Sequence, residues 1–189
     1  MRLFTAIDVP AEVRDALQSF VHRLKPLAKL GWSSMENQHI TTKFIGEWPE
    51  ARLAELQRAL AAVCEPAAVE PVPITIRGIG WFPDSGRPRV FWAGVEAGEA
   101  LGALARRTEQ AVVALGAPVE TRAFAPHLTL ARIRTAVSLK PLRDALDALP
   151  SGCGFDFGSF GATEFFLYLS AGGKYTKLAR YRFAAIPVS

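Results

Sequence analysis

A short His-x-Thr pattern occurs twice in this chain, and it constrains the possible fold more than any other feature. The first copy, His39-Ile40-Thr41, and the second, His127-Leu128-Thr129, begin 88 residues apart in a chain with only three histidines. A single match of this length carries little weight because short patterns recur by chance. Two copies at corresponding places indicate an internal duplication.

A longer repeat surrounds the two copies. The opening segment Arg2-Leu3-Phe4-Thr5-Ala6 resembles Arg89-Val90-Phe91-Trp92-Ala93 at an offset of 87 residues. Each segment begins a strand, leads into an amphipathic helix and reaches a His-x-Thr strand. The repeat is longer than the period of solenoid proteins, so we expect two pseudo-symmetric lobes within one domain spanning 1–189. Equivalent strands would meet about one axis, which places His39 and His127 across a shared groove.

Hydrophobic periodicity predicts a mixed α+β chain. Apolar residues recur at helical spacing in four segments and at strand spacing in eight. A connection containing Trp32 is expected at 30–36, and Ser138 is expected to cap the fourth helix. The predicted helices are 11–24, 49–63, 98–115 and 139–149, and the predicted strands are 3–9, 38–46, 72–79, 89–95, 126–133, 154–161, 163–170 and 175–186.

Composition fits an ordinary globular protein, with 50% hydrophobic and 21% charged residues and a net charge of +4. No segment approaches the roughly 20 apolar residues of a membrane span, and the first residues do not read as a secretory signal. We therefore expect a cytoplasmic protein. Cys64 and Cys153 are the only cysteines, and their spacing predicts two free thiols and no zinc site.

Alternation along a strand determines what the repeated pattern presents. Side chains at positions i and i+2 point to the same face, so each copy places an imidazole beside a hydroxyl. The intervening Ile40 and Leu128 point to the opposite face, as core residues do. Two copies facing one another would form a site of two imidazoles and two hydroxyls.

That set of groups suits phosphodiester hydrolysis. One imidazole can be neutral and take a proton from water, while the other is protonated and gives a proton to a leaving oxygen. The hydroxyls can donate hydrogen bonds to phosphate oxygens as charge develops. No nucleophile triad or carboxylate cluster is apparent, so the pattern favours hydrolysis of a strained cyclic phosphate without a metal or cofactor. The alternatives are a duplicated structural strand and a metal site, for which the sequence offers only two ligands of the right type.

These residues resemble the two-histidine phosphoesterase superfamily, and more narrowly the RNA 2′,3′-cyclic phosphodiesterases, also called 2′-5′ RNA ligase-like proteins. Motif one lies in 38–46 and motif two in 126–133, and the likeness extends over essentially the whole chain. The resemblance implies two antiparallel sheets that line a central groove, with helices outside. It also implies a monomer that opens RNA 2′,3′-cyclic phosphate ends, or a cyclic nucleotide, to a 2′-phosphomonoester, without a membrane association.

The resemblance assigns roles to the motif residues. His39 is implied to be the proton donor to the 3′ oxygen, and His127 the proton acceptor that activates water. Thr41 and Thr129 are implied to hold the phosphate. The motifs read His39, Ile40, Thr41, Thr42 and His127, Leu128, Thr129, Leu130, with Thr42 where leucine is usual. Alternation directs Thr42 away from the groove, so we expect it to have little effect on the chemistry.

Phe44 and Arg132 each stand five residues after a motif histidine. The resemblance implies that they sandwich the terminal base by stacking and cation–π contact. Strict alternation disagrees, because an offset of five lands on the opposite face. Either the strand bulges there, or Phe44 belongs to the core and Arg132 to a surface ion pair.

Two other functions remain open from the sequence. The same site could join RNA ends through a 2′-5′ bond, since it can catalyse the reaction in either direction. The chain could also be a non-catalytic module that binds RNA ends.

Overall fold

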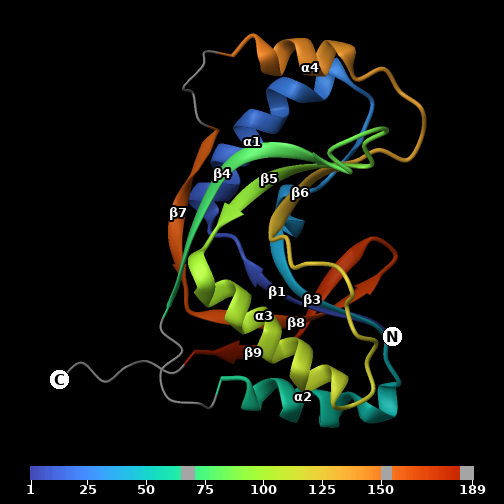
Figure 1. The fold of residues 1–189 in the computed structure, drawn as a ribbon, viewed down its shortest axis with the longest axis vertical. Coiled ribbons are helices and arrows are strands. Elements are labelled where there is room, and N and C mark those ends of the chain that lie inside the picture. The colour runs from blue at the N-terminus through green and yellow to red at the C-terminus, as the bar shows by residue number, and fades with distance from the viewer. Residues whose placement is uncertain (65–70, 150–154, 184–189) are drawn as a thin grey trace, which may run out of the picture.

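The computed structural model describes residues 1–64, 71–149 and 155–183, and in these ranges nine strands form two antiparallel sheets accompanied by four α-helices (Figure 1). The first sheet has the order β3-β1-β8-β9 and the second β2-β6-β5-β4-β7. The first sheet comprises β1 (Arg2–Asp8), β3 (His39–Glu47), β8 (Glu164–Ala171) and β9 (Lys174–Arg182). The second comprises β2 (Gly31–Trp32), β4 (Val72–Phe82), β5 (Val90–Glu96), β6 (His127–Arg132) and β7 (Asp156–Ala162).

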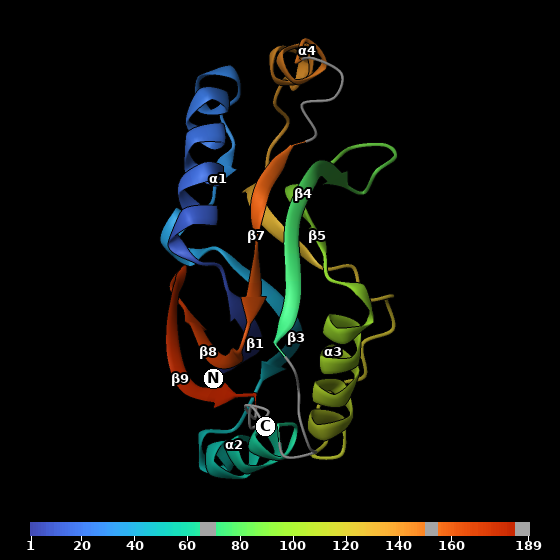
Figure 2. The ribbon, with the colours of Figure 1, turned by 90° about the vertical axis from the view of Figure 1, so that its left-hand side faces the viewer.

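The four helices lie at the ends and on one side of the two sheets. They are α1 (Ala11–Leu24), α2 (Leu53–Ala62), α3 (Gly98–Val113) and α4 (Lys140–Asp147). Both ribbon views place α1 and α4 near one end of the molecule and α2 at the other (Figure 2). The bilobal α+β architecture with two antiparallel sheets agrees with the sequence-based prediction. In the described part of the chain, no helix combines the length and the apolar character that a membrane crossing needs.

The two sheets exchange strands between the halves of the chain. β4 ends the first half in sequence, yet it pairs with β5, the opening strand of the second half. β8 comes from the C-terminal part and pairs with β1, the opening strand of the first half. Each sheet therefore contains strands from both halves, and neither half can complete its sheet alone.

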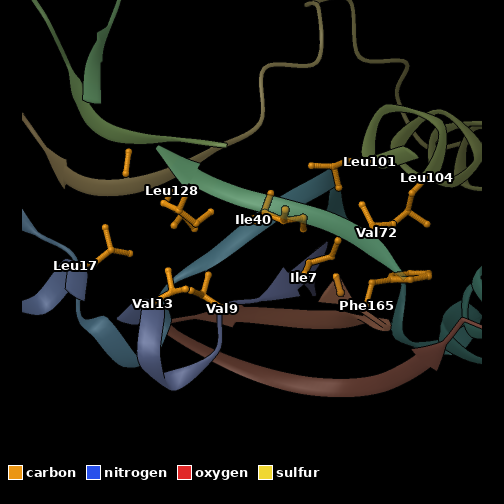
Figure 3. Packing of buried hydrophobic residues seen from close by; sticks show 14 of the residues in the cluster. Ile7, Val9, Val13, Leu17, Ile40, Val72, Leu101, Leu104, Leu128 and Phe165 are labelled. Atoms are coloured by element: carbon orange, nitrogen blue, oxygen red, sulfur yellow. The ribbon is translucent and has the colours of Figure 1, made fainter. Parts of the chain in front are cut away.

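One hydrophobic cluster joins the halves. It includes the α1 stripe of Val13, Leu17, Phe20 and Leu24, whose spacing follows the helical period. Ile40 and Leu128, the residues between His and Thr in the two motifs, belong to the same cluster and are fully buried. Figure 3 shows Ile40 and Leu128 within the packed core. The motif strands are therefore anchored from behind by their own alternate residues.

Pairing of the opening strands corrects the predicted offset of the repeat. Asp8 of β1 lies opposite His39, and Gly94 of β5 lies opposite His127. Relative to the motifs, Asp8 therefore corresponds to Gly94, an offset of 86 residues and not 87. The similarity between the opening segments is real in composition but out of register by one residue.

That single residue matters because strand side chains alternate faces. Phe4 lies on the face of His39, with ring centroids 4.9 Å apart. Phe91, its match at the offset of 87, is fully buried in the main core. The two phenylalanines thus occupy opposite faces of their sheets, and the sequence alignment that paired them was wrong.

Two local predictions also require correction. The first turn of α4 has Leu139 at its N-cap position and no side-chain capping bond, so Ser138 does not cap it. The expected connection at 30–36 contains the two-residue strand β2, which pairs with β6. Some predictions fall outside the described residues: the free thiol of Cys153, and the strand ends at residue 154 and residues 184–186.

Candidate active site

Each motif strand carries a bulge at the same place, three residues after its histidine. The pairing of β1 with β3 skips Thr42, and the pairing of β5 with β6 skips Leu130. In both strands the residue at this position and the next are buried, which interrupts the alternation of buried and exposed side chains. A bulge inserts one unpaired residue and re-aims the side chains that follow.

The bulges bring Phe44 and Arg132 to the exposed side of their strands. Phe44 is 52% exposed, and its ring lies 5.9 Å from that of Phe4, which in turn contacts His39. Arg132 is exposed, and its charge acts on both motif histidines. Of the two arrangements left open by the sequence, the structure has the bulged one. Phe44 is not a core residue.

Thr42 lies on the buried side of β3, as alternation predicts. Its hydroxyl is 2.7 Å from that of Thr5, and both side chains are buried. The two hydroxyls satisfy one another, because each can donate or accept. A threonine can therefore stand where an apolar residue is usual, because Thr5 on β1 supplies a hydrogen-bond partner for its hydroxyl. Thr42 faces away from the motif histidines.

Both motif histidines are fixed in the same way. Nδ1 of His39 lies 2.7 Å from the carbonyl oxygen of Asn37, and Nδ1 of His127 lies 2.8 Å from that of Ala125. A carbonyl oxygen only accepts, so Nδ1 is the donor in each bond. Each ring consequently keeps Nε2 free for a substrate. A hydrogen bond to the second nitrogen is a common way to orient a reactive imidazole.

The two motif strands lie next to one another. The Gln38 side chain donates from Nε2 to the carbonyl oxygen of Thr129 over 3.1 Å, which links the start of β3 to β6. β3 and β6 are in contact. Burial is the main cause that lowers the pKa of His39, and the charges of Arg132 and then His127 lower it further. Thr41 and Thr129 are half-buried on the same strands. The structure thus brings all four predicted residues into one region.

Aromatic side chains and a carboxylate surround His39. Its ring lies 4.9 Å from that of Phe4 and 5.1 Å, edge to face, from that of Tyr175. Asp8 stands opposite His39 in the strand pair and accepts hydrogen bonds from Tyr168 Oη and Lys177 Nζ. Burial, followed by the bond to Asp8, raises the pKa of Tyr168, which keeps this phenol a donor.

Different side chains surround His127. Phe82 lies edge to face at 5.0 Å from its ring, and Trp92 lies 5.1 Å from Phe82. A Cβ at Gly80 would overlap the Trp92 indole, so the glycine makes room for that ring. The position that Asp8 holds beside His39 is held here by Gly94, which brings no charge.

The pKa values of the histidines reflect this difference. Burial lowers the pKa of both imidazoles, because a charged ring loses solvation. The carboxylate of Asp8 opposes that effect at His39 only. The guanidinium of Arg132 lowers the pKa at both.

The described residues offer no group of three or more His, Cys, Asp or Glu side chains placed to hold a metal ion. Two hollows flank the histidine region. One, of about 490 Å³, lies between α3 and the loop before β6, and the other, of about 460 Å³, includes Asp8 and Lys177.

Sequence reasoning did not connect Asp8, Tyr168 or Lys177 with His39, and it considered Lys177 only as a possible contact of the RNA backbone. Asp8 stands at the end of the first predicted strand, four residues after Phe4, so alternation places both side chains on the same face. The incorrect offset of 87 matched it to Val95 rather than to Gly94, so nothing drew attention to the missing charge in the second half. Tyr168 and Lys177 lie far from Asp8 in sequence, and only the sheet order brings them together.

Comparison with known proteins identifies the family. A model of the 2′-5′ RNA ligase superfamily matches residues 10–177. An RNA 2′,3′-cyclic phosphodiesterase of Methanocaldococcus jannaschii is 32% identical over 170 residues, which cover 90% of this chain and 91% of that protein. The protein of the same name from Geobacillus stearothermophilus is 35% identical over 130 residues, but these cover 68% of this chain and only 41% of that longer protein.

Solved structures give the same result. A protein of Thermus thermophilus superposes with a TM-score of 0.78 at 29% identity, covering 97% of this chain and 98% of that one. Escherichia coli LigT in complex with 3′-AMP superposes with a TM-score of 0.74 at 26% identity and the same coverage. With the family model matching most of its length, this chain belongs to the 2′-5′ RNA ligase superfamily.

Proposed function

We propose that this protein hydrolyses RNA 2′,3′-cyclic phosphate ends to 2′-phosphomonoesters without a metal ion. The observation that carries the proposal is the duplicated imidazole geometry, in which Nδ1 is bound to a backbone carbonyl two residues upstream. Each ring is thereby left with Nε2 for proton transfer, beside a threonine two residues later. The names of the family relatives support the choice of substrate.

In the proposed reaction, Nε2 of neutral His127 takes a proton from water. The water oxygen forms a bond to phosphorus, and the bond from phosphorus to the 3′ oxygen breaks. The 3′ oxygen takes a proton from Nε2 of protonated His39, which leaves a 2′-phosphomonoester and a free 3′ hydroxyl. After this step His127 carries one more proton and His39 one fewer. Loss of a proton from His127 to solvent and uptake of one by His39 then restore the enzyme for the next turnover.

The remaining motif residues bind the substrate in this proposal. Thr41 and Thr129 donate hydroxyl hydrogen bonds to the non-bridging phosphate oxygens, where charge accumulates in the transition state. Phe44 offers an exposed ring for stacking on the terminal base, and Arg132 offers a guanidinium to the same base.

The charges around the histidines support the direction of proton transfer. A general acid must be protonated before the reaction, and a general base must be neutral. The carboxylate of Asp8 favours the protonated form of His39, whereas no carboxylate opposes burial at His127. Asp8 is thus the one feature that favours the acid role for His39, although burial still lowers the pKa of both imidazoles.

The test is hydrolysis of a short RNA with a 2′,3′-cyclic phosphate in the presence of a strong chelator. We expect undiminished hydrolysis, a 2′-phosphate product by phosphorus NMR, and loss of turnover in His39→Ala and in His127→Ala. His22→Ala is the matched control, because His22 is exposed on α1 and far in sequence from both motifs.

Three results would count against parts of the proposal. Loss of activity in chelator would exclude the metal-free mechanism, and a 3′-phosphate product would mean that a different oxygen leaves. A wild-type protein that binds the RNA without changing it would be a binding module.

A further inference from the structure

The cavity between α3 and the loop before β6 has no role in the reaction described above. It has a volume of about 490 Å³, which is within the usual range of about 300–1,000 Å³ for sites that bind small ligands. We call it the α3 cavity. Its lining includes Val95, Glu99, Gly102, Arg106, Phe124 and Pro126.

The α3 cavity adjoins the second motif. Pro126 lines it and immediately precedes His127. Phe124 lies three residues before His127, and three residues of chain span at most about 11 Å. A ligand that continues from the phosphate at His127 can therefore enter the cavity within a short distance.

The groups in the α3 cavity suit a nucleobase. Phe124 is 41% exposed, which is unusual for a large apolar side chain and leaves its ring available for stacking. Base stacking on aromatic rings is the common means of holding single-stranded RNA. Arg106 adds a planar guanidinium that stacks on bases and donates hydrogen bonds.

Glu99 distinguishes a base from a phosphate. Its carboxylate lines the same cavity and would repel a phosphate, but it accepts hydrogen bonds from the amino groups of bases. Gly102 on the same face of α3 has no side chain to fill the space. The cavity thus combines a stacking ring, a cation and an acceptor around an open volume.

We propose that the α3 cavity binds the base of the nucleotide that precedes the cyclic-phosphate residue. The inference rests on the proposed function, since an RNA with a cyclic phosphate at its 3′ end continues only in the 5′ direction. The protein then acts on RNA ends in preference to single cyclic nucleotides.

The test compares a trinucleotide carrying a 2′,3′-cyclic phosphate with a nucleoside 2′,3′-cyclic monophosphate. We expect a higher kcat/KM for the trinucleotide in the wild type. Phe124→Ala should lower kcat/KM for the trinucleotide about 5- to 100-fold and leave the mononucleotide within about twofold. Val119→Ala is the matched control, because Val119 is an exposed apolar residue of the same loop and does not line the cavity.

A second variant avoids any disturbance of the loop that carries Ala125. Gly102→Leu fills the α3 cavity from the helix side, where an added Cβ meets only Arg106 Nη1 at 3.4 Å. Leucine also favours a helix over glycine. Gly102→Leu should lower kcat/KM for the trinucleotide selectively, as Phe124→Ala does. In the wild type, a trinucleotide that lacks its penultimate base should show a similarly lowered kcat/KM.

The outcomes separate this inference from the proposed function. Wild-type protein that hydrolyses neither substrate overturns the proposed function. Wild-type protein that hydrolyses both equally, with no effect of Phe124→Ala or Gly102→Leu, overturns only the α3 cavity. Equal losses on both substrates would show that the variants act through His127, and undiminished activity without the penultimate base would mean that the cavity does not read a base.

Discussion

The halves that carry His39 and His127 share a scaffold and differ in what surrounds it. Both have the same alternation, the same bulge three residues after the histidine, and the same bond from Nδ1 to a carbonyl two residues upstream. Around His39 the duplicated scaffold carries Asp8, held by Tyr168 and Lys177. Around His127 it carries Gly94 and no charge at that position.

In the proposed mechanism, this difference lets a symmetric scaffold support an asymmetric reaction. Identical surroundings would give both imidazoles the same affinity for a proton, and neither role would be preferred. A carboxylate on one side separates the two affinities while leaving the geometry of the pair intact. In the proposed mechanism, the shared features position the two rings, and the carboxylate of Asp8 favours His39 as the acid.

Packing on the histidine faces has also diverged in a complementary way. Ala6 and Trp92 occupy corresponding positions, because they pair with Thr41 and Thr129. Ala6 lies opposite Phe166 on the next strand of its sheet, and Trp92 lies opposite Gly80 on the next strand of the other sheet. Each sheet therefore has one large and one small residue, on opposite strands.

The largest effects should be equal in the two halves. His39→Ala and His127→Ala should each lower kcat by about 10²- to 10⁴-fold, the usual contribution of one general acid or base. The double variant should be much less than additive, since the two residues act in one step. Steady-state rates on a cyclic-phosphate RNA measure this. A loss confined to one histidine would show that the halves do not share a site.

The threonines provide a smaller comparison of the same kind. Thr41→Val and Thr129→Val keep the side-chain shape and remove one hydroxyl donor each, so each should lower kcat about 10- to 100-fold with little change in KM. Single-turnover rates separate this effect from binding. Increases in KM alone would place the threonines in ground-state binding and outside transition-state stabilisation.

Asp8→Asn should sharpen the difference between the halves. The carboxylate raises the pKa of His39, so its removal lowers that pKa and reduces the protonated fraction of the acid at neutral pH. The alkaline limb of the kcat/KM profile should move to lower pH, and activity should fall several-fold more at pH 8 than at pH 6. The acidic limb, which His127 determines in the proposed mechanism, should stay in place.

Lys177→Met is the matched control for Asp8→Asn. It removes one partner of Asp8 and leaves the carboxylate beside His39. We expect no shift of the alkaline limb to lower pH. A profile that moves in the same way in both variants would mean that the network acts by holding the fold and not by its charge.

The smallest effect concerns stability at the bulge in β3. Thr42→Val leaves the Thr5 hydroxyl buried and unpaired, which should lower the free energy of unfolding by about 1–3 kcal/mol. Replacing both by valine removes the pair and should recover most of that loss. Urea denaturation of the two single variants and the double variant measures the coupling. Losses that simply add would show that the hydroxyls do not depend on one another.

The motif faces could be predicted from the sequence, because alternation over three residues needs no information from other strands. The bulges could only be left as one of two alternatives, since nothing in the residue types of Thr42-Lys43 and Leu130-Ala131 shows that two successive side chains are buried. The exchange of β4 and β8 between the sheets was equally hidden. Spacing along the chain indicates which segments are strands but not which strands pair.

The roles of the two halves can be separated with a substrate whose leaving group needs no proton. In a cyclic phosphate with sulfur in place of the bridging 3′ oxygen, the leaving group is a thiolate, which needs no proton from an acid. If His39 is the acid, His39→Ala should regain most of the wild-type rate on this substrate, while His127→Ala stays inactive. Recovery by His127→Ala and not by His39→Ala would contradict the assignment.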